Sequence, residues 1–103
     1  MRIPNSFKIA GLEIQVVNQP GLFRAEKATG KIDYKNLVIY LDFDACAEGY
    51  LEQTFVHECV HWILYVMNHP LVKDEGFVDT FAQLAYQIVD SMRGGETHPV
   101  IGA

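Results

Sequence analysis

Two histidines and a glutamate stand at a spacing that suits metal chemistry. The segment His57-Glu58-Cys59-Val60-His61 matches the pattern H-E-x-x-H. On a helix, residues four apart lie on the same face with Cβ atoms about 5–6 Å apart, so both imidazoles can bind one Zn²⁺. Glu58 lies about 100° around the helix from His57, outside the ligand set but within reach of a metal-bound water. The pattern therefore indicates metal-assisted hydrolysis with Glu58 as the general base.

A catalytic zinc ion normally takes three protein ligands and a water, so the two histidines need a partner. Glu75 and Asp79 form a carboxylate pair four residues apart, and a nearby cation would relieve their mutual repulsion. The alternative interpretation of this pair is a solvated acidic helix start, which the helix dipole favours. His69 and His98 are reserve ligands, and we expect both to be ordinary surface histidines.

The HExxH segment followed by Glu75, with Asp79 four residues later, resembles the gluzincin pattern of thermolysin-like peptidases. With its short β-rich first half, the chain is similar to small ImmA/IrrE-like and phage-encoded HExxH peptidases and to the single-domain minigluzincins. The resemblance implies a zincin-like minimal core that binds Zn²⁺ and hydrolyses peptide bonds. It implies His57, His61 and Glu75 as metal ligands, Glu58 as general base, and Asp79 as the acceptor that orients a ligand histidine.

The spacing between the two parts of the pattern is short. Only 13 residues separate His61 from Glu75, fewer than in the large thermolysin-like enzymes. A simple antiparallel helical hairpin would bring Asp79 or Gln83, instead of Glu75, to the level of His61. Either the first helix breaks before Asn68 so that the chain returns early, or Asp79 takes the ligand role.

The resemblance also implies a peptide or protein substrate that pairs with the strand before the HExxH helix, here Leu37–Phe43. The spacing does not choose an oxyanion-stabilising residue among the tyrosines, which are Tyr34, Tyr40, Tyr50, Tyr65 and Tyr86. Two other functions stay open. One is a non-catalytic metal-binding interaction or regulatory module of phage or mobile-element origin, and the other is a latent peptidase whose own tail lies in the cleft.

Apolar patterning predicts the elements that must position these side chains. Period-2 alternation predicts a strand over residues 12–16 and a hairpin over 31–43, with 19–29 as a loop. A helical period predicts a mostly buried helix over 51–68, crossed by a polar stripe that carries HExxH, and a second helix from the N-cap Asp74 to Arg93. We expect an α+β fold in which a small, mostly antiparallel sheet of about three strands packs on the HExxH helix and a C-terminal helix.

Length and charge limit the remaining functions. The 103 residues suit a single domain over 1–93 with a flexible tail at 94–103. A net charge of −5 argues against nucleic acid as a partner, and the longest apolar run is too short to cross a membrane. No secretory signal is visible in this chain, so we expect a cytoplasmic protein whose Cys46 and Cys59 stay reduced. The sequence does not indicate an oligomeric state.

Overall fold

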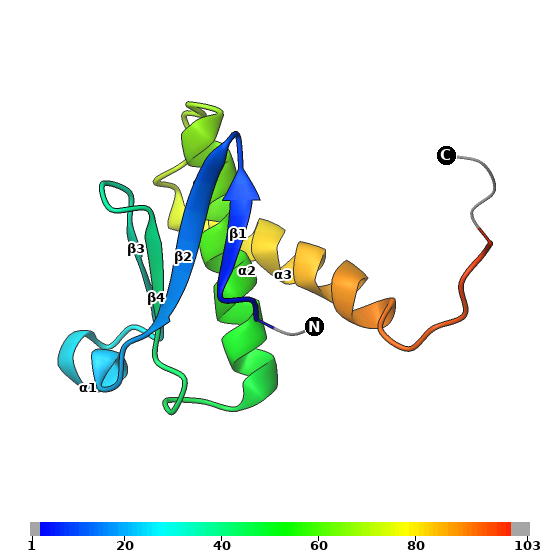
Figure 1. Cartoon of the computed structure of the whole chain (residues 1–103), viewed down its shortest axis with the longest axis horizontal. Helices are drawn as coiled ribbons and strands as arrows, with labels where there is room; N and C mark the ends of the chain where they lie inside the picture. Colours follow the sequence, from blue (N-terminus) through cyan, green and yellow to red (C-terminus); the bar gives the residue numbers. More distant parts are fainter. Residues whose placement is uncertain (1–2, 100–103) are drawn as a thin grey trace.

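The computed structural model describes residues 3–99, which form a four-stranded sheet and three helices (Figure 1). In chain order the elements are β1 (Ser6–Ile9), β2 (Leu12–Asn18), α1 (Leu22–Glu26), β3 (Gly30–Asp33), β4 (Val38–Leu41), α2 (Glu48–Val66) and α3 (Glu75–Ser91). The α+β class predicted from the sequence is confirmed. The sheet has four strands instead of about three, and it is mixed.

The strand order is β1-β2-β4-β3, which leaves β1 and β3 at the two edges. β1 pairs antiparallel with β2, and β3 pairs antiparallel with β4, but β4 lies parallel to β2. The sequence analysis missed β1 because its four residues join β2 through Ala10 and Gly11, an unusual hairpin sequence. Both residues have positive φ, 50° and 78°, as a tight two-residue hairpin turn requires.

The predicted hairpin is present as β3 and β4, although its second strand ends at Leu41 instead of Phe43. Its turn is held by Asp33, whose carboxylate accepts hydrogen bonds from the backbone N–H and the Nδ2 of Asn36 at 3.0 and 2.8 Å. These hydrogen bonds lower the pKa of Asp33. The alternation of β4 buries Ile39 and Leu41 completely, so this strand belongs to the core.

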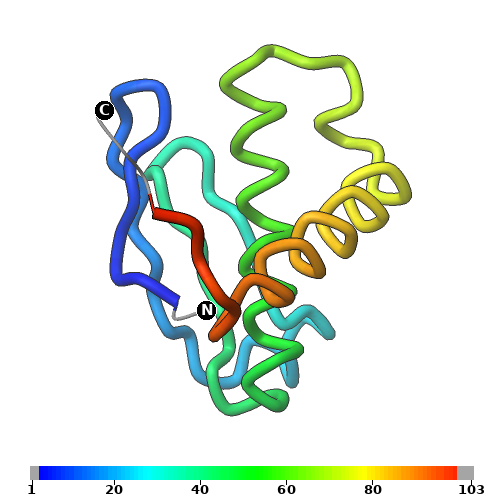
Figure 2. The backbone as a smooth tube through the Cα atoms, turned by 90° about the vertical axis from the view of Figure 1, so that its right-hand side faces the viewer, coloured from blue at the N-terminus to red at the C-terminus, as the bar shows by residue number. Residues whose placement is uncertain are grey.

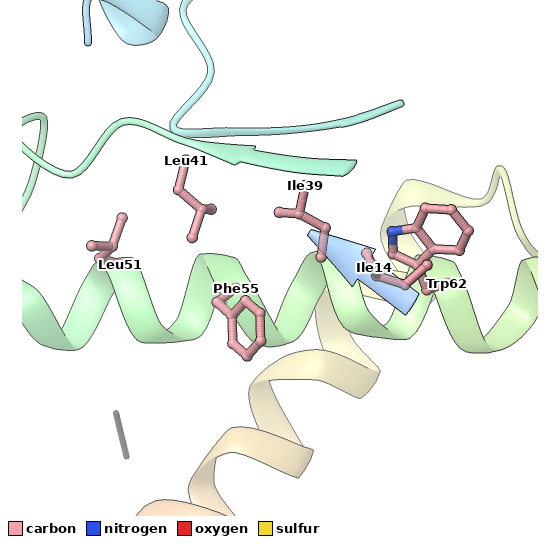
Figure 3. Packing of buried hydrophobic residues seen from close by; sticks show 6 residues of the cluster. All are labelled: Ile14, Ile39, Leu41, Leu51, Phe55 and Trp62. Atoms are coloured by element: carbon pink, nitrogen blue, oxygen red, sulfur yellow. The ribbon is translucent and has the colours of Figure 1, made fainter. Parts of the chain in front are cut away.

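The core lies between the sheet and α2. Figure 3 shows the side chains of the strands meeting those of the helix: Ile14, Ile39 and Leu41 face Leu51, Phe55 and Trp62. Because apolar side chains recur along one side of α2, that side is covered by the sheet. The predicted buried helix is therefore present, but it begins at Glu48 and ends at Val66 instead of spanning 51–68.

The end of α2 has a well-defined cap. Asn68 adopts a positive φ of 52°, its N–H donates to the carbonyl of Tyr65, and the N–H of His69 donates to that of Leu64. These two hydrogen bonds form a Schellman motif, in which a left-handed residue closes the last turn. The helix therefore ends two residues before the predicted end at residue 68.

α3 begins as predicted, because the side chain of Asp74 accepts a hydrogen bond from the N–H of Phe77 at 3.0 Å. The helix packs on α2 through Val78 and Ala82. Figure 1 shows it extending away from the sheet, and in Figure 2 it runs obliquely to α2. Near its end, Arg93 forms an ion pair with the buried Glu52 of α2.

The segment predicted as a loop at 19–29 contains the short helix α1, whose Leu22 is buried. The backbone N–H of Phe23 donates to Asp42, which ties α1 to the end of β4. Residues 95–99 form no helix or strand, and residues 100–103 of the predicted tail lie outside the described residues. Among the described residues, no helix combines the length and apolarity needed to cross a bilayer.

Candidate metal centre

The two histidines of the HExxH segment face one carboxylate. His57 and His61 stand one turn apart on α2 with their ring centroids 5.1 Å apart. The Nε2 atom of His57 lies 3.2 Å from one Glu75 oxygen, and the Nε2 atom of His61 lies 3.0 Å from the other. Within residues 3–99, this is the one group of three metal-ligating side chains that converges, with all ligand atoms within 4.8 Å of one another.

The early end of α2 places Glu75 at the histidines. α2 stops at Val66, residues 67–74 turn back over one side of the helix, and Asp74 caps α3 so that Glu75 is its first residue. Of the two arrangements that the sequence left open, the structure has the one in which the first helix ends before Asn68. Glu75, and not Asp79, faces both Nε2 atoms, although its role as a ligand stays a prediction.

Asp79 lies one turn further along α3, beside the other nitrogen of His57. Its Oδ1 is 3.5 Å from His57 Nδ1, and its Oδ2 accepts a hydrogen bond from Gln83 at 2.9 Å. The Gln83 contact holds the Asp79 carboxylate in place. Asp79 therefore stands where an acceptor that orients His57 is needed.

The ring of His61 is oriented by a backbone carbonyl. His61 Nδ1 lies 2.9 Å from the oxygen of Val72, and because a carbonyl can only accept, Nδ1 carries the proton. In the neutral imidazole, the Nε2 lone pair then points at a Glu75 oxygen 3.0 Å away. Two electron-rich atoms at this distance need a proton or a metal cation between them.

The donor set could hold a metal ion. Two imidazole nitrogens and one carboxylate would make three protein ligands, the number that catalytic zinc sites use beside a fourth position for water or substrate. The Nδ1 atoms of both histidines have acceptors behind them, as ligating histidines in metal sites normally do. Glu75 is 69% exposed, so the open side of the cluster faces solvent.

Glu58 lies beside the cluster but is buried, with only 6% of its surface exposed. Burial, and in second place the charge of Glu75, raises the pKa of Glu58 to about 7. A carboxyl group in this environment can both accept and release a proton near neutral pH. Its position outside the His57, His61 and Glu75 group agrees with the helical offset predicted from the sequence.

The cluster stands in a cleft of about 700 Å³. One wall is formed by residues 27–32 and Tyr34, the floor by the polar stripe of α2, and the other wall by residues between 72 and 83. The cleft is thus bounded by β3, α2 and the start of α3.

The strand beside the cleft is β3, not the segment Leu37–Phe43 that the resemblance implied. That expectation is wrong, because β4 lies inside the sheet with β2 and β3 on its two sides and has no free edge. The carbonyl of Thr29 accepts from Asp42 across the β3–β4 pair. By antiparallel alternation, the backbone groups of Gly30 and Ile32 therefore point out of the sheet, to the free edge.

Gly30 is a site residue that the sequence analysis missed. A Cβ atom at this position would lie 2.7 Å from Cγ2 of Thr54 and 3.1 Å from Oε2 of Glu58. Only glycine lets β3 approach α2 this closely. A glycine at the start of a predicted strand is a known signal of close backbone approach, and it could have been noted.

The structure reduces the number of tyrosines that can act at the site. Of the five named from the sequence, only Tyr34 and Tyr50 line the cleft. Tyr34 stacks on Tyr65 with ring centroids 4.2 Å apart. Burial, followed by the charges of Glu58 and Glu75, raises the pKa of Tyr34 to about 12, so its hydroxyl stays protonated and can donate a hydrogen bond.

The reserve histidines lie away from the cluster. His69 Nδ1 accepts a hydrogen bond from the N–H of Leu71, and neither His69 nor His98 lines the cleft. None of residues 94–99 lines it either, so the described part of the tail does not occupy the cleft. Cys46 and Cys59 are both free thiols in this structure.

Comparisons with known proteins found no family model, no curated protein and no solved structure that matches this chain. The residues of the site and their geometry are therefore the basis for assigning a function.

Proposed function

We propose that the chain is a zinc-dependent metallopeptidase of the gluzincin type. The observation that carries the proposal is the convergence of His57 Nε2, His61 Nε2 and the Glu75 carboxylate beside the buried Glu58, in an open cleft. His57, His61 and Glu75 would hold Zn²⁺. When bound, the ion supplies Lewis-acid activation of water and of the scissile carbonyl.

Glu58 acts as the general base. Its carboxylate takes a proton from the attacking water as the new C–O bond forms, and it gives that proton to the amine nitrogen as the C–N bond breaks. Burial raises the pKa of Glu58 to about 7 in the metal-free chain, and a cation bound at the neighbouring ligands would lower it again, which favours the carboxylate form that a base needs. Tyr34 or Tyr50 would donate a hydrogen bond to the developing oxyanion.

The free edge of β3 would bind the substrate. A peptide in extended conformation can pair with the outward backbone groups of Gly30 and Ile32, which brings it past Glu58. This backbone pairing does not depend on the substrate's side chains, but it needs an extended chain. The substrate is therefore a peptide or an unfolded protein segment.

The expected compartment is the cytoplasm.

Charge in the cleft favours acidic peptides. Outside the cluster of histidines and carboxylates, the charged residues that line it are all lysines: Lys27, Lys31 and Lys73. This is unusual in a chain with 13 acidic and 8 basic residues. Since Lys31 already pairs with Glu26, Lys27 and Lys73 are the cations that would attract acidic side chains of a substrate.

Two variants test the proposal. Elemental analysis of the purified wild type should find about one zinc per chain, and His57→Ala should lose most of it. Glu58→Gln should keep the zinc and lose hydrolysis of a mixed peptide substrate, by about 100-fold or more. A chain that binds zinc but shows no hydrolysis that Glu58→Gln abolishes would instead support the non-catalytic metal-binding module.

A further inference from the structure

One face of α3 carries apolar side chains that no other described element covers. Phe81, Leu84, Ile88 and Met92 are 51, 57, 62 and 64% exposed, and we call these four residues the α3 stripe. Their spacings of three, four and four residues place them on one side of the helix. The side that packs on α2, with Val78 and Ala82, is a different one, so the stripe faces away from α2.

The stripe is large for a chain of this size. Each of its side chains leaves about 100 Å² exposed, which gives a continuous apolar surface of about 400 Å². Two such surfaces packed together, with their flanking residues, would bury a total of about 1,000 Å². This area is at the lower end for a specific protein interface, so it suits a weak but defined dimer.

The charges around the stripe are compatible with a second copy of the chain as the occupant. The chain carries a net charge of −5, so two copies repel each other, and this repulsion is smallest when they meet through an uncharged face. The residues beside the stripe are neutral: Thr80, Ala85, Gln87 and Ser91. The acidic residues of α3, which are Glu75, Asp79 and Asp90, lie on the opposite side of the helix.

A membrane surface fits the same face less well. Amphipathic helices that bind membranes carry Lys and Arg on their polar side, which attract anionic lipids. Residues 75–91 contain no Lys or Arg, and the polar side of α3 is acidic.

We propose that the chain forms a symmetric homodimer in which the α3 stripe packs on the α3 stripe of a second copy. A helix face that pairs with itself around a twofold axis needs only to be self-complementary. An uncharged apolar stripe meets this condition. The cleft is lined by the opposite side of α3, including Asp79 and Gln83. The dimer therefore leaves the cleft open and is independent of the proposed hydrolysis.

Sedimentation equilibrium of the full chain tests the dimer. The wild type should shift from the 11.6 kDa of one chain to twice that mass between about 1 and 200 µM, with a Kd of about 10 µM. Ile88→Glu places a charge in the centre of the stripe and should weaken association by at least about 100-fold. Gln87→Glu adds the same charge beside the stripe and should weaken association much less.

Circular dichroism should show that both variants keep the helical content of the wild type, because Ile88 and Gln87 are exposed. Added salt should leave the dimer intact or strengthen it, because the proposed interface contains no ion pair to screen and salt weakens the repulsion between two chains of net charge −5. A wild type that stays monomeric at about 200 µM would overturn the proposal. So would a dimer that Ile88→Glu leaves unchanged, because the interface would then lie elsewhere.

Discussion

Replacing Gly30 by alanine probes the contact between β3 and α2 with a single methyl group. The new Cβ atom would lie 2.7 Å from Cγ2 of Thr54 and 3.1 Å from Oε2 of Glu58. Both distances are shorter than an ordinary van der Waals contact, so strand and helix must move apart or the side chains must shift. We expect Gly30→Ala to destabilise the protein.

Two opposing terms set the magnitude. Overpacking at a tight contact costs about 1–3 kcal/mol. Gly30 does not have the positive φ that would strain alanine. Because alanine restricts the unfolded chain, the substitution also stabilises the folded state by about 0.4–1 kcal/mol. The net expectation is a loss of about 1–2 kcal/mol in the free energy of unfolding, which corresponds to a Tm lower by about 10 °C.

A second substitution identifies the methyl group responsible. Thr54→Ser removes Cγ2 but keeps the hydroxyl, which donates to the carbonyl of Tyr50 and lies 3.2 Å from the hydroxyl of Thr29. In the double variant with Gly30→Ala, the new Cβ occupies the space that Cγ2 left. The double variant should therefore be more stable than the sum of the two single effects by about 1 kcal/mol.

Urea unfolding followed by the fluorescence of the single, buried Trp62 measures these differences. Gly49→Ala is the matched control, since its Cβ would meet only the Tyr86 hydroxyl, at an ordinary 3.9 Å. Alanine at that helical position should raise stability. If Gly30→Ala were as stable as the wild type, or Thr54→Ser gave no compensation, the close approach of β3 to α2 would be refuted.

Four further predictions follow from the site and its surroundings. Chelation should lower the Tm, because free zinc at 100 times its Kd adds about 2.7 kcal/mol, and an unchanged Tm would contradict a folded-state zinc site. Burial raises the pKa of Cys59 to about 12, so this thiol is almost never ionised at pH 8. Iodoacetamide should therefore modify Cys46 first, as measured by peptide mass spectrometry, and equal rates of modification at the two cysteines would contradict this. Lys73→Glu should reduce hydrolysis of acidic peptides more than of neutral ones, and equal losses would remove Lys73 from substrate selection. Hydrogen bonds from Asn36 lower the pKa of Asp33. The ionised Asp33 therefore stabilises the folded state fully above the ordinary pKa of 3.8, and this stabilisation is lost as the pH falls through the lowered pKa of the folded state. Acid unfolding of Asn36→Ala should lack this component, and an unchanged profile would be the contrary result.

Helices α2 and α3 and the placement of HExxH on α2 could be predicted because they follow from local periodicity, whereas the short α1 shows no such period. The register of α3 against α2 could not be predicted, because it depends on the residue at which α2 ends. Asn68 ends it with a left-handed conformation, which asparagine adopts more readily than most residues but which its presence does not require. The choice between Glu75 and Asp79 therefore depended on a single backbone conformation.

The sheet was harder to predict for a different reason. Alternation in 12–16 and in the 31–43 hairpin shows that strands exist but does not say which edges meet. β4 pairs in parallel with β2, although α1 and β3 separate them along the chain, and this pairing moves β3 to the edge. The strand beside the cleft was misassigned because strand order is a long-range property, whereas sequence patterns report local structure.

The geometry separates the two parts of the proposed chemistry. Glu75 reaches the histidines because of residues 67–74, so substitutions in that turn should act first on metal affinity. Glu58 is buried because β3 approaches α2 at Gly30, so changes there should act first on proton transfer. If Gly30→Ala in the Thr54→Ser background kept zinc and stability but lost hydrolysis, the two walls of the cleft would be shown to serve different steps.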